Sequence, residues 1–279
     1  MDDNTNVTDI TKKADVVAED PKDVKEGVQV INKQAKVLVA VPCQEMVNVN
    51  FVTSLMYLQK PEGSSITFTQ SSILPQSRDT LADIAIRGDY THILFVDSDM
   101  TFPQDALHKL FVHNVDICTA LCFARKEPHN PCIYNRIEYE HPVKGIHNGN
   151  ITVEEDIERD FFEIKACGMA FCLIKVSALN DIRNRSDGEL FSYIGTFGED
   201  LSFCIRALKC GYKLYCDATI PIGHIGEKIF RKNDYYLHKQ FEALRQQQES
   251  KKEEENKEVT LDDSELVIEE NSKSEGESL

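Results

Sequence analysis

The chain has 279 residues, of which 41% are hydrophobic, and a formal net charge of -16 at pH 7. This length suits one large domain or two small ones, and the acidic balance argues weakly against tight nucleic-acid binding, which relies on Lys and Arg to neutralise phosphates. No apolar run approaches the roughly 20 residues of a membrane span, and the polar N-terminus is unlike a signal peptide, so we expect a cytoplasmic protein without a membrane span.

The two ends of the sequence differ in composition from its centre. Residues 1–35 contain 5 Lys/Arg against 8 Asp/Glu, and residues 246–279 contain 4 against 12, which gives net charges of -3 and -8. Such segments bury too little apolar surface to offset the chain entropy lost on folding. We therefore expect a folded domain over 36–245 between a disordered N-terminal tail and an acidic disordered C-terminal tail, with helix continuing into the Gln run near residue 246.

Short apolar runs alternate with helical patterns in the first half of the domain. The runs predict strands over 36–42, 65–69, 92–96 and 115–123. Between them, residues at helical spacing predict helices over 47–60, over 76–87 and from Pro103 onward. This alternation predicts an α/β/α sandwich with a mostly parallel central sheet, in which ligands bind beyond the carboxyl ends of the strands.

The second half of the domain is less regular. Residues 130–165 are rich in Pro, Gly, Asn and charged residues, which predicts an irregular loop or flap. An apolar block split by Gly168 follows over 161–175, and residues 198–212 predict a helix that ends with Gly211 at its C-terminal cap.

The chain contains nine cysteines. No C-x-x-C pair occurs, several cysteines lie in apolar runs, and the number is odd. These features predict buried free thiols that act as small hydrophobic side chains, in a reducing compartment such as the cytosol.

Two carboxylates stand directly after one buried strand, in Asp97-Ser98-Asp99. Like charges this close repel each other unless a cation lies nearby. Mg²⁺ and Mn²⁺ prefer hard oxygen ligands of this kind and complete their shells with substrate phosphates and water. The motif therefore fits a platform for a metal and a diphosphate, although Asp-Ser-Asp also suits a turn or a helix N-cap before Pro103.

Six short motifs follow one another through the domain. They are V-L-V-A-V-P-C-Q-E (37–45), S-R-D-T-L-A (77–82), F-V-D-S-D (95–99), A-C-G-M-A-F-C-L-I (166–174), F-G-E-D-L-S-F-C-I-R-A (197–207) and I-G-H-I-G (222–226). In this order they resemble the motifs of GT-A fold nucleotide-sugar glycosyltransferases of the family 2 type, in the short soluble form seen in phages and microbes. The resemblance covers about 36–230 and rests on the joint order, because no motif is specific alone.

The resemblance implies a site for a nucleotide sugar, most simply one linked to UDP. It assigns eight residues to the donor: Pro42, Gln44, Glu45, Arg78, Asp79, Asp97, Ser98 and Gly168. It also implies that Asp99 and His224 bind Mn²⁺ or Mg²⁺ together with Asp97, which is placed at the ribose or at a metal-bound water.

The resemblance further implies inverting transfer of the sugar to a hydroxyl acceptor. Asp200 is the expected catalytic base. Two alternatives for its neighbour Glu199 are that Glu199 is the base in place of Asp200 or that it positions the acceptor. Two interpretations without a catalytic role remain open: Glu199 and Asp200 complement a helix dipole, and His224 is a solvent-facing loop residue.

The acceptor, which is a glycan, a protein or a modified nucleic acid, is not named by the sequence, and three other functions stay open. A glycosyltransferase acting on modified DNA bases fits a chain without a membrane anchor, although the acidic charge weighs against it. A nucleotidyltransferase normally has a Gly-rich basic loop after the first strand, where this chain has P-C-Q-E-M. A non-catalytic nucleotide-binding module would not need both acidic motifs.

Overall fold

The computed structural model describes five stretches of the chain: 35–71, 73–139, 149–227, 231–232 and 235–247. The chain divides into two units, Met1–Gly226 and Glu227–Leu279. The tails predicted to be disordered lie outside the described residues, apart from Ala35 and residues 246–247.

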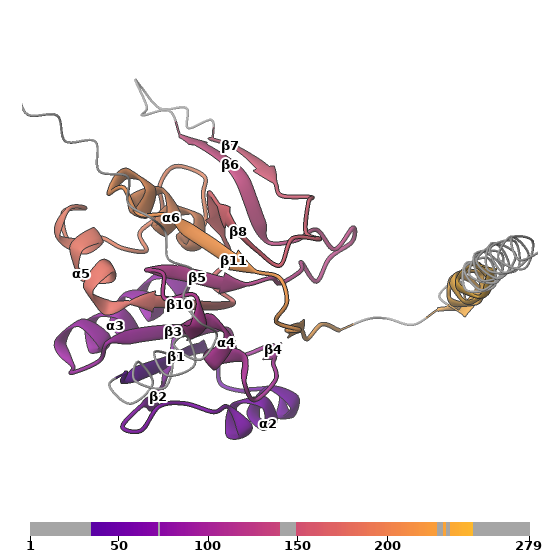
Figure 1. Ribbon diagram of the computed structural model, residues 1–279, viewed down its shortest axis with the longest axis horizontal. Coiled ribbons are helices and arrows are strands. Elements are labelled where there is room, and N and C mark those ends of the chain that lie inside the picture. The colour runs from indigo at the N-terminus through magenta and orange to yellow at the C-terminus, as the bar shows by residue number, and fades with distance from the viewer. Residues whose placement is uncertain (1–34, 72, 140–148, 228–230, 233–234, 248–279) are drawn as a thin grey trace, which may run out of the picture. The chain divides into compact units, whose positions relative to one another are not determined.

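Seven strands form the central sheet of the first unit (Figure 1). In spatial order they are β2 (Ser65–Gln70), β1 (Val37–Cys43), β3 (His92–Val96), β10 (Phe171–Lys175), β5 (Ile117–Ala120), β11 (Leu214–Asp217) and β8 (Phe161–Ile164). Five of them run in one direction, because only β10 and β8 pair antiparallel with their neighbours. The sheet is therefore mostly parallel, as predicted.

Helices cover both faces of this sheet. They are α2 (Val49–Tyr57), α3 (Leu74–Arg87), α4 (Ala106–Val112), α5 (Val176–Asn184) and α6 (Glu199–Lys209). Buried residues of α2 and α4 share one core, and those of α3, α5 and α6 share the other. Strand β3 serves both cores, with Ile93 and Phe95 on one face and Leu94 and Val96 on the other, which explains its unbroken apolar run. The predicted α/β/α sandwich is confirmed.

Two small sheets accompany the central one. Strand β12 (Gly223–His224) pairs with β4 (Met100–Thr101), and β6 (Ile133–Tyr139) lies between β7 (Gly149–Val153) and β9 (Ala166–Cys167). The prediction of an irregular loop or flap over 130–165 is therefore wrong for the described residues 130–139 and 149–165, while residues 140–148 lie outside the described residues. A shift of register between Tyr134 and Arg136 breaks the alternation of apolar and polar residues that normally reveals a strand.

Helix boundaries also differ from those predicted. Helix α4 begins at Ala106 rather than Pro103, because Pro103 first closes a turn in which its carbonyl accepts from the Ala106 amide at 3.1 Å. Helix α6 ends at Lys209, and Gly211 follows with φ +84°, the left-handed conformation expected just past a helix end.

All nine cysteines lie within the described residues, and each is a free thiol, as the sequence predicts. Six of them are buried. None of the described helices is both long and apolar enough to cross a membrane.

The second unit is described only in part. Residues 235–247 form a helix whose large apolar side chains are exposed: Tyr235, Tyr236, Leu237, Phe241 and Leu244.

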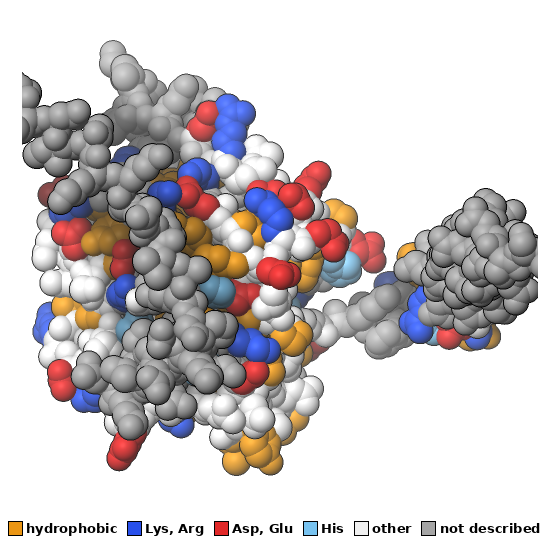
Figure 2. Space-filling model, viewed as in Figure 1, with side chains coloured by type: hydrophobic (Ala, Val, Ile, Leu, Met, Phe, Trp, Pro, Cys, Tyr) orange, Lys and Arg blue, Asp and Glu red, His pale blue; other side chains and the backbone are white. Residues whose placement is uncertain are grey.

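On the face of the molecule shown in Figure 2, described acidic and basic side chains are interspersed rather than gathered by sign.

Three aromatic rings form the centre of the core that α3, α5 and α6 share. The Phe191 ring stacks on Phe203 with centroids 5.1 Å apart and meets Phe95 edge-on at 5.3 Å. Phe191 lies in the loop between α5 and α6, so this contact fixes the loop to the sheet.

Replacing Phe191 with Ala should lower the free energy of unfolding by about 3–5 kcal/mol, because the change removes a buried ring and leaves a cavity. Urea denaturation measures this loss. Met56→Ala is the control, since Met56 is 77% exposed and its loss should cost about 0.5 kcal/mol or less. Equal losses in the two variants would contradict the assigned core.

Candidate active site

The D-x-D motif lies where the carboxyl end of β3 meets the segment that precedes β10. The Asp97 amide donates to the Ala170 carbonyl at 3.0 Å, which extends the ladder between β3 and β10 by one residue. The Met100 amide then donates to the Asp97 carbonyl at 3.2 Å, so the motif also forms the turn that the sequence allows. This turn places Asp97 and Asp99 against different partners.

Asp97 is held by a buried arginine from α3. Arg78 is 1% exposed, and its Nη2 donates to Asp97 Oδ1 at 2.8 Å while its Nε donates to Glu199 Oε1 at 3.2 Å. Burial opposes the charge of Arg78, but the charges of Asp97 and Glu199 and the hydrogen bond to Asp97 outweigh it and raise its pKa. Arg78 therefore positions two carboxylates and is sealed off from solvent.

Asp200 lies beside this cluster, in the first turn of α6. Its Oδ1 accepts from the Leu201 amide at 2.7 Å, and its Oδ2 lies 3.8 Å from the position a Cβ on Gly168 would occupy. Burial and the charge of Glu199 raise the pKa of Asp200 to about 6. A carboxylate with this pKa is poised to accept a proton near neutral pH.

Asp99 faces His224, which lies in β12. The β4–β12 pairing and a bond from the Ile225 amide to the Asp99 carbonyl, at 2.7 Å, fix the two segments together. His224 Nε2 then lies 3.4 Å from Asp99 Oδ2. Gly223 permits this approach, because a Cβ there would lie 2.6 Å from Thr101 Oγ1.

Arg125, from the loop after β5, completes the group around Asp99. Its Nη1 lies 3.0 Å from the same Oδ2 that His224 approaches. Burial alone would raise the pKa of Asp99, but the hydrogen bond and charge of His224, with the charge of Arg125, lower it. The hydrogen bond to Asp99 in turn raises the pKa of His224.

Asp99 and His224 fit a divalent cation in their donor chemistry. His224 Nδ1 lies 2.8 Å from the Phe123 carbonyl, which can only accept, so Nδ1 keeps its proton; when the Nε2 proton that bonds Asp99 leaves, the lone pair of Nε2 faces Asp99. Mg²⁺ usually takes only one or two protein carboxylates, and its other ligands are substrate phosphates and water. Among the described residues, no group of three or more His, Cys, Asp or Glu side chains is arranged to hold a metal.

The remaining predicted donor residues lie in three places. Gln44 and Glu45 are exposed just past β1, which runs parallel to β3, whereas Pro42 is buried in β1. Ser98 lies in the turn between the two aspartates and Gly168 lies beside Asp200. Asp79 Oδ1 accepts from the Phe191 amide at 3.3 Å, so this carboxylate anchors the loop before α6.

Sequence patterns did not single out three residues at this site. Arg125 stood out only as part of a short basic pair, Arg125-Lys126. The pKa of Cys132 is lowered by a hydrogen bond from Cys122 and by the charge of His224, and that of Tyr134 is raised to about 12 by burial and by nearby Cys132 and Asp200. Cys132 and Tyr134 come from the segment predicted to be irregular, which hid them.

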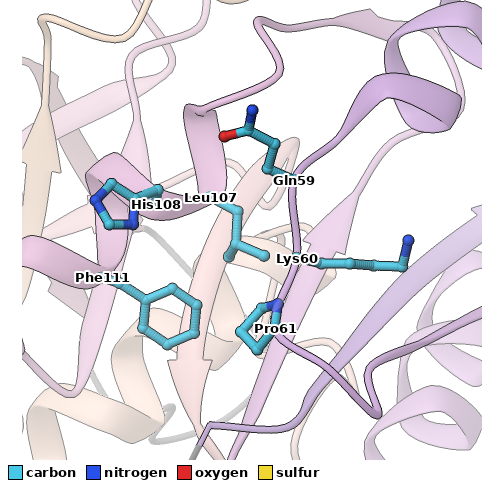
Figure 3. A pocket seen from close by; sticks show the side chains of 6 residues that line it. All are labelled: Gln59, Lys60, Pro61, Leu107, His108 and Phe111. Atoms are coloured by element: carbon cyan, nitrogen blue, oxygen red, sulfur yellow. The ribbon is translucent and has the colours of Figure 1, made fainter. Parts of the chain in front are cut away.

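A separate pocket lies between the α2–β2 connection and α4 (Figure 3). It is lined by Gln59, Lys60, Pro61, Leu107, His108 and Phe111. These residues precede β2 and β5, whereas Asp97 and Asp99 of the candidate site follow the carboxyl end of β3, and Arg125 follows that of β5. The pocket is therefore not part of the candidate site.

No family model matches this sequence, and no curated protein does. Among solved structures, A197 from STIV is similar with a TM-score of 0.50 and 16% identity, covering 69% of this chain and 86% of that chain. GalNAc-T7, solved with UDP, GalNAc and Mn²⁺, has a TM-score of 0.47 and 11% identity, covering 69% of this chain and 43% of that chain. The likeness to A197 shows a shared fold alone.

Replacing Arg78 with Met should lower the free energy of unfolding by about 3–5 kcal/mol, because it leaves Asp97 and Glu199 without their buried partner. Denaturant titration measures this loss. The same change at Arg87 is the control, since Arg87 pairs with Asp83 on the exposed face of the same helix and should contribute about 1 kcal/mol or less. Similar losses for both arginines would contradict the proposed positioning role of Arg78.

Proposed function

We propose that this chain is a metal-dependent glycosyltransferase that moves a sugar from a UDP-linked donor to a hydroxyl acceptor with inversion at the anomeric carbon. We assign the activity to a domain over 36–245. Every residue of the candidate site lies in the first unit, Met1–Gly226. One observation carries the proposal: the Asp99–His224 pair and the high-pKa Asp200 both belong to the edge of the sheet around the end of β3. Substrates of open α/β sheets bind at such an edge.

Asp200 is the proposed catalytic base. Glu199 is less suited, because its Oε1 already accepts from the buried Arg78. In the transfer, the acceptor oxygen forms a bond to the anomeric carbon while the bond from that carbon to the diphosphate oxygen breaks. The acceptor proton passes to Asp200, and the electron pair leaves with UDP. One base and no covalent intermediate suffice for this single displacement.

Asp99 and His224 are the proposed ligands of Mn²⁺ or Mg²⁺. When bound, the cation supplies charge stabilisation for the diphosphate leaving group. His224 is oriented for this role by the Phe123 carbonyl. Asp97, held by Arg78, is the proposed partner of the ribose or of a metal-bound water.

The donor nucleotide is proposed to lie along the ends of β1 and β3, where Gln44 and Glu45 are exposed. The space beside Gly168 and Asp200 is then left for the reacting hydroxyl. The mixed charges on the face shown in Figure 2 offer no extended basic surface among the described residues there, so that face does not favour a DNA acceptor.

The high pKa of Asp200 favours an enzyme over a non-catalytic nucleotide-binding module. Burial and the neighbouring Glu199 destabilise ionised Asp200, and this placement costs folding stability. Strongly perturbed carboxyls of this kind cluster at catalytic sites, where a proton is transferred, which favours the enzyme.

Replacing Asp99 with Ala should abolish the gain in UDP affinity that Mn²⁺ provides, because the change removes one of the two proposed protein ligands of the metal and leaves only His224. Calorimetry with UDP, with and without Mn²⁺, measures this gain. Asp105→Ala is the control, since Asp105 pairs with Lys109 on a partly exposed face. Metal-dependent heat that is unchanged in Asp99→Ala would remove the metal site.

Replacing Asp200 with Asn should lower kcat by about 10²–10⁴-fold and leave UDP binding nearly unchanged. In the wild type, kcat/KM should fall about tenfold per pH unit below a pKa near 6, because only ionised Asp200 accepts the proton and kcat/KM reports the free enzyme. Steady-state transfer or donor hydrolysis across pH measures both effects.

Two comparisons accompany this variant. Glu199→Gln keeps an oxygen for Arg78 and should retain the acid limb of the profile, moved to lower pH, because the charge of Glu199 no longer raises the pKa of Asp200. Complete loss of that limb in Glu199→Gln alone would make Glu199 the base. Because the folded-state pKa of Asp200 lies above its unfolded value, its ionised form destabilises the fold above that pKa. Asp200→Asn should therefore gain up to about 3 kcal/mol of stability well above pH 6.

A further inference from the structure

Arg125 and His224 approach the same oxygen of Asp99. Nη1 of Arg125 lies 3.0 Å from Oδ2, and Nε2 of His224 lies 3.4 Å from it. A divalent cation bound by Asp99 and His224 would be repelled by a guanidinium at this distance. The cation and the Arg125 guanidinium therefore compete for Asp99.

The two partners of Asp99 differ in how firmly they are held. His224 is fixed by strand pairing with Met100 and by the Phe123 carbonyl. Arg125 comes from an exposed loop, and its side chain is 53% exposed. Its stem lies over Gly226, with carbon atoms 3.6–3.7 Å from the position of a Cβ there. The guanidinium can leave Asp99 by side-chain rotation, while Asp99 and His224 stay in place.

A donor diphosphate bound through a cation on Asp99 would lie within the reach of a guanidinium that starts on the same carboxylate. Guanidinium groups bind phosphate oxygens through paired hydrogen bonds, and the loss of Asp99 as a partner leaves those donors available. The neighbouring basic residue, Lys126, is exposed and lies on the same loop.

We propose that Arg125 occupies the cation position on Asp99 in the metal-free protein and moves to the diphosphate of the donor when metal and nucleotide bind. This inference rests on the proposed function. It makes Arg125 a donor-binding residue that couples the two ligands, because nucleotide binding draws Arg125 away from Asp99, where it competes with the metal. By linkage, the metal then increases nucleotide affinity by the same factor.

The test measures Mn²⁺ and UDP binding separately in the full chain. In Arg125→Gln, Mn²⁺ alone should bind several-fold more tightly than in the wild type, because Asp99 has lost its competing partner. At saturating Mn²⁺, the Kd for UDP should rise by about tenfold or more, which is the loss expected for one charge-assisted contact. Calorimetry or Mn²⁺ electron paramagnetic resonance reports the first effect, and UDP calorimetry reports the second.

Lys126→Gln is the matched control, since it removes the same charge one residue along the same loop and should change both affinities little. Opposite changes in the two affinities, confined to Arg125→Gln, support the proposal. Changes of the same sign, or changes shared with Lys126→Gln, overturn it while the proposed function stands. A wild-type chain that binds neither Mn²⁺ nor UDP overturns both.

Discussion

The buried guanidinium of Arg78 joins three elements at the candidate site. It comes from α3 and binds Asp97 at the end of β3 and Glu199 at the start of α6. A buried arginine is tolerable only when its charge is compensated nearby, so these three elements must close together. Arg78 also acts on Asp200: burial and the charges of Glu199 and Asp97 raise the pKa of Asp200, the Leu201 amide and the charge of Arg78 lower it, and the resulting pKa is about 6.

The turn through Asp97-Ser98-Asp99 divides two adjacent carboxylates between two tasks. Asp97 pairs with the buried Arg78, and Asp99 pairs with His224 of β12. A turn and a ligand-binding motif were alternative interpretations of the sequence, but the structure makes them compatible. The turn is the reason that the two like charges face different cations instead of each other.

The sequence was sufficient for the elements whose patterns are local. The apolar run at 92–96, the helix that carries Arg78 and the fold class all follow from periodicity, and the order of the motifs brought Asp99 and His224 into one hypothesis. Contacts between distant segments were not visible. Burial of Arg78 depends on Glu199, far along the chain, and the approach of Arg125 to Asp99 depends on a loop beside Gly226. The register shift in β6 also breaks the strand period beside Tyr134 and so concealed the strand from sequence analysis.

Strand β10 lies between β3 and β5 and pairs antiparallel with both, although it follows them in the chain. During synthesis on the ribosome, the edges of β3 and β5 therefore stay open until residues 171–175 have emerged. The Asp97 amide finds its partner Ala170 only at that moment. A nascent chain halted before this strand would expose two strand edges with unpaired backbone N–H and C=O groups, and such edges favour pairing with other chains, and hence aggregation.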